Sequence, residues 1–265
     1  MLNERRGTKM TLSDEQIKEL LKWFATSSET RKKWSGERKK AYQKNKEWIQ
    51  FEVIQKLPEE ELSEKFREYY KSGGGNKQNL IQINRERIIA NKSRFKEVIL
   101  YLLNEKIELK ERIDEIMDGK FKIEGFAQAI LTSLLMDANI EKYCIWNNKT
   151  EEGLDVLGWK VYDNKDSWGE AYEKVLDALK KLKTLVTELN LTLDDVDLFL
   201  HTIAAESEGE KIIAKLRGEN IVLTESTFNS VNLLEKKKQI ILYGPPGTGK
   251  TFNTRELSIK IIESN

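Results

Sequence analysis

Residues 127–136 read AQAILTSLLM, and apolar side chains occupy nearly every side of the helix that this stretch would form. A helix that is apolar all round needs protein on every side, so we predict that it lies at the centre of a core. The stretches around it repeat their apolar residues at helical spacing, and no convincing strand alternation precedes Ile240. The sequence therefore predicts a mainly α, multi-helix domain built around residues 127–136.

Helix boundaries are signalled by capping residues on both sides of this central stretch. Ser13 and Gln16 match a capping box, and an apolar face follows at Ile17, Leu20, Leu21 and Phe24. Pro58 opens an acid-rich first turn, and Thr192 to Asp195 opens a last helix that should run to about residue 205. Further helices are expected over residues 91–102, 107–118, 150–157 and 167–189.

Composition limits the classes of protein that this chain can represent. With 265 residues, 39% of them hydrophobic, it can bury a sizeable core, and no apolar run is long enough to predict a membrane span. Residues 1–10 lack the apolar centre of a signal peptide, and Cys144 as the single cysteine excludes an internal disulfide. We therefore expect a cytoplasmic protein, with Cys144 a buried thiol and the single histidine, His201, on a helix face.

The formal net charge is +1, but basic residues concentrate between residues 31 and 46. This stretch contains eight lysines and arginines and one glutamate. Such spacing suits phosphate neutralisation, and interleaved aromatic rings can stack on bases. The patch is either a nucleic-acid contact surface or the solvated face of a helix whose rings pack inward. A smaller basic excess recurs over residues 77–96. The candidate contact residues are Arg31, Lys32, Lys33, Trp34, Arg38, Lys39, Lys40 and Tyr42.

Three tryptophans, Trp146, Trp159 and Trp168, lie close together in a turn-rich segment. They line a pocket for a planar base in one interpretation, as in proteins that read a flipped base. In the other interpretation they anchor the core and the loops, which is the commoner use of tryptophan.

The segment at 240–251 reads IILYGPPGTGKT and matches the phosphate-binding pattern G-x-x-x-x-G-K-[ST]. An apolar strand-like run precedes the glycines, and Leu257, Ile261 and Ile262 follow at helical spacing, so the order is strand, loop and helix. Glycines let backbone N–H groups approach phosphate oxygens, and the helix start adds a positive dipole end. The predicted nucleotide-binding residues are Gly244, Pro245, Pro246, Gly247, Thr248, Gly249, Lys250 and Thr251.

Within that loop, Lys250 is predicted to contact the outer phosphates, and the Thr251 hydroxyl is predicted to bind Mg²⁺. The paired prolines and the preceding strand make the segment similar to the Walker A motif of AAA+ NTPases. Its lead-in helix, residues 224–236, further resembles the McrB-like group, which are the nucleotide-driven subunits of modification-dependent DNA restriction systems. Residues 125–159 also resemble a segment of the N-terminal helical regions of such proteins.

The resemblance implies a cofactor and partners. It implies ATP or GTP as the nucleotide, a homohexameric ring, DNA as a substrate and a nuclease-linked partner subunit, without a membrane. The acidic strand, the sensor and the arginine finger of an AAA+ module would all follow the loop helix, so we expect no catalytic residue within these 265 residues. We expect the chain to be the N-terminal part of a longer NTPase and to be inactive alone.

The expected organisation is a helical recognition or adaptor domain over 1–208, a hinge with a lead-in helix over 209–233, and the start of an incomplete AAA+ domain over 234–265. Two alternatives remain in which this fragment has no catalysis. The helical part is then a nucleic-acid-binding module, or it is an adaptor that binds protein through an exposed apolar helix face.

Overall fold

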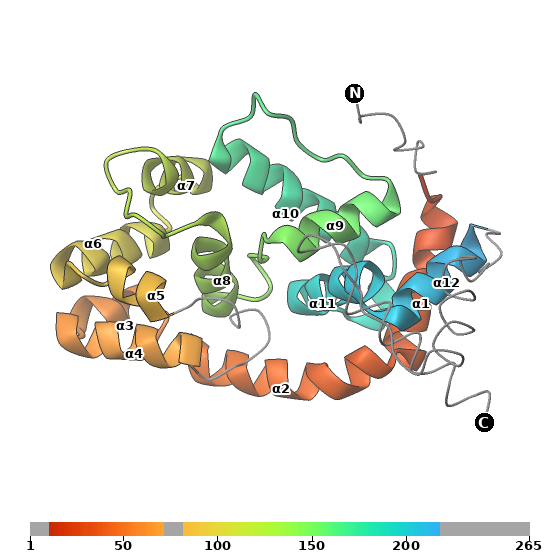
Figure 1. The fold of residues 1–265 in the computed structure, drawn as a ribbon, viewed down its shortest axis with the longest axis horizontal. Coiled ribbons are helices and arrows are strands. Elements are labelled where there is room, and N and C mark those ends of the chain that lie inside the picture. Colours follow the sequence, from red (N-terminus) through yellow and green to blue (C-terminus); the bar gives the residue numbers. More distant parts are fainter. Residues whose placement is uncertain (1–10, 72–81, 218–265) are drawn as a thin grey trace, which may run out of the picture. The chain divides into compact units, whose positions relative to one another are not determined.

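The computed structural model describes residues 11–71 and 82–217, and all regular structure in these two ranges is helical (Figure 1). The predicted mainly α class is thereby confirmed for this part of the chain. The predicted strand, loop and helix at 240–265 lie outside the described residues. The helices are α1 (Asp14–Ser27), α2 (Glu29–Lys46), α3 (Phe51–Lys56), α4 (Glu59–Lys71), α5 (Gln82–Ile88), α6 (Lys92–Leu103), α7 (Leu109–Met117), α8 (Gln128–Ala138), α9 (Asn148–Leu157), α10 (Trp168–Thr184), α11 (Leu193–Ala205) and α12 (Ser207–Leu216).

Helix α8 is the predicted apolar helix, and it is covered by protein on nearly every side. All of its residues from Ile130 to Asp137 are buried, and it packs against α2 and α6. Burial of this kind removes the whole side-chain surface from water, which is the main favourable contribution to folding. The prediction of a central helix is confirmed.

The start signals at Ser13, Pro58 and Thr192 locate the beginnings of α1, α4 and α11 correctly. Side chains of Ser13, Ser167 and Thr192 close capping boxes at the starts of α1, α10 and α11, and Asn147 does the same for α9. Each box satisfies backbone N–H groups that have no partner within the helix. A capping box lies within four consecutive residues, so it can be predicted from the sequence.

The predicted helix over residues 167–189 is wrong at its C-terminal end. Helix α10 ends at Thr184, and a short 3₁₀ turn follows at Thr187–Leu189. The chain leaves the helix at Val186, whose side chain is fully buried, and Asn190 adopts a left-handed conformation with φ of 46°. Val186 is thus buried outside the helix, where the backbone turns. Helical spacing of apolar residues does not distinguish this position from one inside the helix.

Helix α2 joins two groups of helices, because it packs against both α8 and α11 (Figure 1). Its buried residues are polar: Thr30, Arg38 and Asn45. The Arg38 guanidinium donates to Asp194 of α11 through Nε at 2.8 Å and to Asp197 through a terminal nitrogen at 2.6 Å. At the other end, the Asn45 amide donates to Asp137 of α8 at 2.9 Å. Two buried polar anchors therefore hold α2 in place.

The first compact unit of the chain extends to Ile213, and the second begins at Ala214. The boundary predicted at residue 208 falls inside α12, and the first residues of the predicted 209–233 hinge are helical. Gly209 is buried against the carbonyl oxygen of Thr202, where an added Cβ would come within 2.1 Å of that oxygen. Glycine is therefore required for α12 to approach α11 this closely.

The N-terminus of α2 is capped by a carboxylate that is distant in sequence. Glu208 of α12 accepts hydrogen bonds from the Ser28 hydroxyl at 2.7 Å and from the backbone N–H groups of Glu29 and Thr30 at 2.9 Å. Burial alone would raise the pKa of Glu208, but these hydrogen bonds lower it below its ordinary value. The ionised form is therefore the one that the fold stabilises.

Replacing Arg38 tests the anchor between α2 and α11. We expect Arg38→Ala to lower the free energy of unfolding by about 3–5 kcal/mol, because it leaves buried carboxylates without their counter-charge. Urea denaturation followed by circular dichroism measures this change. The control Lys39→Ala, on the exposed side of the same helix, should change the free energy by less than about 0.5 kcal/mol. Equal effects of the two variants would contradict the role of Arg38.

Glu208→Gln tests the cap and has a defined pH dependence. A carboxyl with a lowered pKa contributes stability above its ordinary pKa, and that contribution is lost as the pH falls through the lowered value. We expect Glu208→Gln to cost about 1 kcal/mol at pH 7. The difference from the natural chain should shrink below about pH 4. Glu37→Gln, exposed on α2, is the control, and a pH-independent difference for Glu208→Gln would count against this account.

Candidate functional site

The predicted nucleotide-binding loop, from Gly244 to Thr251, lies outside the described residues. The predicted Mg²⁺ ligand Thr251 belongs to it. Two other surfaces predicted from the sequence can be placed: the basic helix and the tryptophan cluster. No helix in the described ranges has the length and apolarity needed to cross a bilayer.

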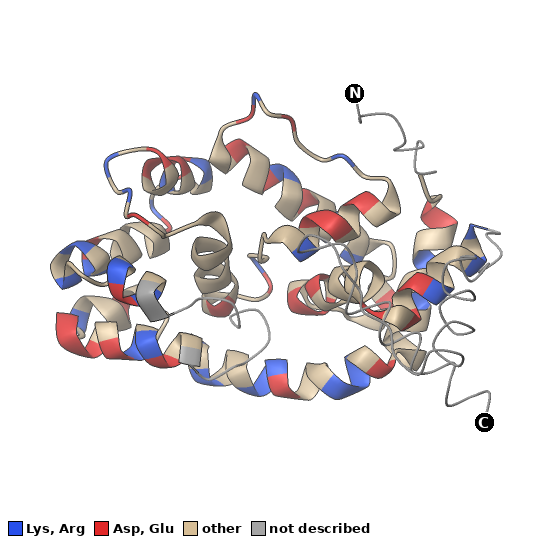
Figure 2. Cartoon of the chain, in the orientation of Figure 1, with Lys and Arg blue, Asp and Glu red and all other residues tan. Residues whose placement is uncertain are grey.

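The basic stretch forms α2, and lysines recur along its exposed side (Figure 2). Lys32, Lys33, Lys39 and Lys40 are all exposed, as is Lys44 one turn further along. Lys32 pairs with Glu29 at 2.7 Å. The other four form no ion pair with a residue in the described part of the chain. Their charges are therefore available to a ligand.

The two aromatic residues of this patch, Trp34 and Tyr42, make cation–π contacts with lysines of the same helix. Lys33 Nζ lies 4.8 Å from the ring centroid of Trp34, and Lys46 Nζ lies 5.5 Å from that of Tyr42. Both rings are half-buried, so they contribute to packing as well as to the surface. The patch therefore has features of both predicted interpretations: its rings pack partly inward, and its lysines are exposed where nucleic acid could contact them.

The two arginines of the predicted patch have structural partners. Arg38 is buried in the anchor to α11 and is not at the surface. Arg31 donates to the carbonyl oxygen of Ala25 at 2.7 Å and lies 5.7 Å from the ring centroid of Phe24. A count of charges along the sequence includes both arginines, although neither one extends freely into solvent.

The smaller basic excess at residues 77–96 is largely compensated. Lys77 lies outside the described residues. Arg87 pairs with Glu124 at 3.0 Å and Arg94 with Glu97 at 2.6 Å, while Lys92 pairs with Glu60. Lys96 donates to the carbonyl oxygen of Leu57 at 2.6 Å. This region offers much less free positive charge than α2.

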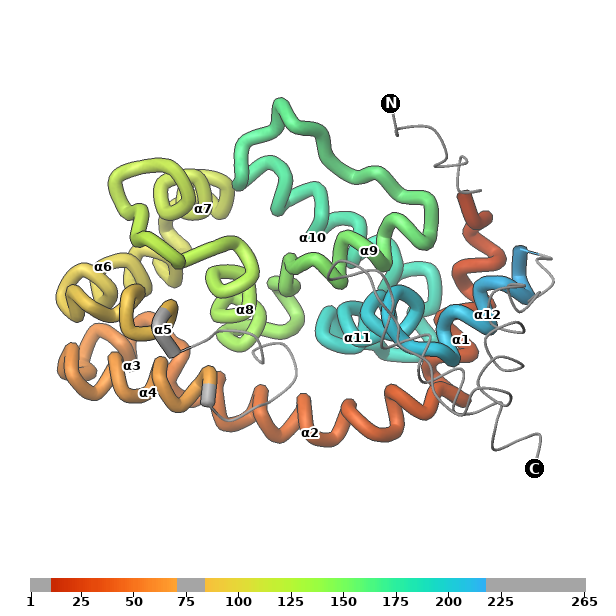
Figure 3. The backbone as a smooth tube through the Cα atoms, in the orientation of Figure 1, coloured from red at the N-terminus to blue at the C-terminus, as the bar shows by residue number. Residues whose placement is uncertain are grey.

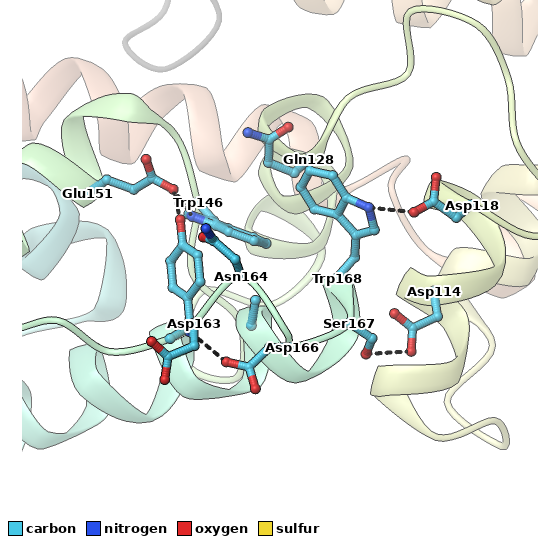
Figure 4. A pocket seen from close by; sticks show the side chains of 12 residues that line it. Asp114, Asp118, Gln128, Trp146, Glu151, Asp163, Asn164, Asp166, Ser167 and Trp168 are labelled. Atoms are coloured by element: carbon cyan, nitrogen blue, oxygen red, sulfur yellow. Dashed lines mark hydrogen bonds between the residues drawn. The ribbon is translucent and has the colours of Figure 1, made fainter.

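Two of the three tryptophans meet at an open cavity of about 690 Å³ between α7, α9 and α10 (Figure 4). Figure 3 follows the chain through the long connection from α9 to α10, which contributes much of the lining. Trp159 does not line the cavity and instead lies under Lys181, whose Nζ is 4.7 Å from its ring centroid. The lining residues are Asp114, Asp118, Gln128, Trp146, Glu151, Tyr162, Asp163, Asn164, Asp166, Ser167, Trp168 and Ala171.

The aromatic part of the cavity is centred on Trp146, which is 2% exposed. The rings of Tyr162 and Trp168, both half-buried, lie 5.3 and 5.8 Å from it, centroid to centroid. Each indole N–H is engaged: Trp146 Nε1 donates to Glu151 at 2.9 Å, and Trp168 Nε1 donates to Asp118 at 2.7 Å. These hydrogen bonds fix the orientation of both rings.

Carboxylates surround these rings and are held in defined positions. Asp114 accepts from the Gly169 N–H at 2.7 Å and from the Ser167 hydroxyl at 2.9 Å, at the start of α10. Burial opposes ionisation of Asp114, but these hydrogen bonds and Lys110 lower its pKa below the ordinary value. Lys122, and then the Trp168 N–H, lower the pKa of Asp118. Both groups are therefore ionised at neutral pH.

Glu151 differs from the other lining carboxylates in its partners. Trp146 Nε1 and the Tyr162 hydroxyl both donate to its Oε1 atom. Burial and this contact raise the pKa of Tyr162 to about 12, so the phenol remains a donor at neutral pH. No lysine or arginine in the described ranges pairs with Glu151.

Neither of the two residue types most often used as nucleophile or base forms a site here. Cys144 is fully buried, and burial raises the pKa of its thiol well above the ordinary value, so the thiolate nucleophile does not form. His201 on α11 lies 3.4 Å from Glu206. Within residues 11–71 and 82–217, no group of three or more His, Cys, Asp or Glu side chains is placed to hold a metal ion.

Sequence reasoning identified the tryptophans of the cavity but missed its carboxylates. Asp114 lies in α7 and Asp118 directly follows that helix, some fifty positions from their hydrogen-bond partners Gly169 and Trp168. The Glu151 contact had a usable local signal, since Glu151 follows the Asn147 cap by one helical turn and Trp146 lies five positions before it.

Comparisons with protein-family models, with curated proteins and with solved structures find no match to this chain.

Proposed function

We propose that this chain is the N-terminal part of an AAA+ NTPase of the McrB-like group. Residues 244–251 bind ATP or GTP with Mg²⁺, and the helical domain recognises DNA whose restriction or remodelling the motor drives. Support for the nucleotide site is the G-x-x-x-x-G-K-[ST] pattern between an apolar run and a helical period. Hydrolysis by such a module uses an acidic strand, a sensor and an arginine finger. The resemblance also implies a hexamer and a nuclease-linked partner subunit.

Support for nucleic-acid recognition comes from α2. Its exposed lysines without ion pairs, Lys33, Lys39, Lys40 and Lys44, follow one another along a single helix of 18 residues. Cations in such a row neutralise successive phosphates and release counterions, which favours binding at low salt. The contact would be to the backbone, and it therefore supplies affinity rather than sequence preference.

The alternative of a protein adaptor with an apolar docking face has less support. In the described part of the chain, one large hydrophobic residue is exposed, namely Val53 at 36%. A helix face that docks through apolar contacts would show several such residues together.

Lys250→Ala tests the nucleotide site. We expect it to abolish Mg²⁺-dependent binding of fluorescent ATP and GTP analogues by the protein that carries the complete NTPase module, because the lysine charge on the outer phosphates is lost. Fluorescence anisotropy measures the affinity, and competition by unlabelled ATP and GTP identifies the preferred base. Lys260→Ala, in the helix expected after the loop, is the control. Unchanged binding by Lys250→Ala would refute the site.

Neutralising α2 tests the nucleic-acid surface. We expect Lys33→Gln, Lys39→Gln and Lys40→Gln together to reduce the slope of log affinity against log salt by about 2–3 for duplex DNA. Anisotropy of a labelled duplex, titrated between low and moderate salt, measures the slope. The control neutralises Lys18, Lys65 and Lys122, which already pair with carboxylates. Absence of DNA binding at low salt by the natural chain would remove this part of the proposal.

A further inference from the structure

The cavity between α7, α9 and α10 combines aromatic walls with five carboxylates, and the described residues that line it include no lysine, arginine or histidine. We propose that this cavity binds an organic cation, namely an alkylated ammonium or a guanidinium group. The proposal is independent of nucleotide binding by residues 244–251.

Four of the five carboxylates already have a counter-charge outside the lining, and the fifth, Glu151, has none among residues 11–71 and 82–217. The aspartates pair at 2.5–3.0 Å, Asp114 with Lys110, Asp118 with Lys122, Asp163 with Lys160 and Asp166 with Lys174. The two hydrogen bonds to Glu151 both reach Oε1, which leaves Oε2 to accept from a ligand. Its donors Trp146 and Tyr162 are neutral, so the negative charge of Glu151 is uncompensated within the described residues.

The rings supply the second half of the recognition. The face of an aromatic ring attracts a cation, most strongly for tryptophan and when the ring is partly shielded from water. Tyr162 and Trp168 are half-buried beside Trp146. Figure 4 shows the two indoles between Glu151 on one side and Asp118 on the other. A cation placed against these rings is therefore flanked by negative charge.

The same features disfavour the other ligand classes. A nucleotide is disfavoured because its phosphates would be repelled by the lining carboxylates. The pocket for a planar base was predicted from the tryptophans alone, without these negative charges. A metal ion is disfavoured because the lining carboxylates are not grouped to coordinate one. The volume of about 690 Å³ suits a small organic molecule or a side chain with its flanking backbone.

The test compares matched ligands by NMR on the full 265-residue chain. Choline and its neutral isostere 3,3-dimethyl-1-butanol are titrated while the indole N–H resonances of Trp146 and Trp168 are followed. N-acetyl-arginine methylamide provides the guanidinium probe. We expect saturable shifts with choline, with the arginine amide or with both, and affinity for the neutral isostere at least about fivefold weaker.

The charge is tested by Glu151→Gln, which keeps an oxygen acceptor for Trp146 and Tyr162. We expect it to weaken cation binding about three- to tenfold. The control Glu152→Gln alters the next residue, an exposed glutamate paired with Lys149, and should leave the affinity unchanged. Trp168→Leu should weaken binding similarly; if that variant does not fold, Glu151→Gln decides alone.

Comparison of choline with an acetylated trimethyl-lysine methylamide separates the two sources of such a cation. Tighter binding of the lysine derivative identifies a protein side chain as the ligand, and equal or weaker binding identifies a small free cation; either outcome supports the site. The proposal would be overturned if neither choline nor the arginine amide bound more tightly than the neutral isostere. Shifts produced by deoxycytidine but by none of the cations, or no shifts at all, would also overturn it.

Discussion

The buried contact between Arg38 and the aspartates of α11 is the interaction on which the helical domain depends. Helix α2 buries Thr30, Arg38 and Asn45 and has no continuous apolar stripe, so hydrophobic burial alone does not fix its position. Burial by itself would lower the pKa of Arg38, but Asp194 and Asp197 outweigh it and raise the pKa, keeping the guanidinium charged. Burying a charged guanidinium costs free energy unless hydrogen bonds to carboxylates compensate for the lost water. Because Arg38 can make these bonds in one position only, the contact fixes the position of α2 against α11.

This constraint also explains why α2 presents lysines to solvent. The inward residues Thr30, Arg38 and Asn45 recur every seven or eight positions, and Lys33, Lys39, Lys40 and Lys44 lie between them at exposed positions. Lysine tolerates that exposure at little cost, and the resulting row of charges needs no structural partner. The surface proposed to contact DNA is thus the outer side of a helix that is held by its inner polar residues.

The sequence predicted what is local and missed what joins distant segments. The capping boxes at Ser13 and Thr192, and the all-round apolarity of α8, depend on a few consecutive residues, and they were predicted correctly. Arg38 was grouped with the surface lysines because its carboxylate partners lie more than 150 positions away. For the cavity, the sequence predicted only the tryptophans, since the periodicity of apolar residues does not show that Asp114 of α7 and Asp118 after it meet the start of α10.

A single polar chain connects the two candidate surfaces. Asp197, which accepts from Arg38 of α2, lies 3.3 Å from the Thr150 hydroxyl in the first turn of α9, and Glu151 of the cavity is the next residue. The start of α9 is thus held by its Asn147 cap and by the anchor of α2. Glu151 is thereby preorganised before any ligand arrives, which reduces the entropy cost of binding. The opposite charges of the two surfaces then favour different ligands, with a polyanion along α2 and a cation at α9, and neither ligand can substitute for the other.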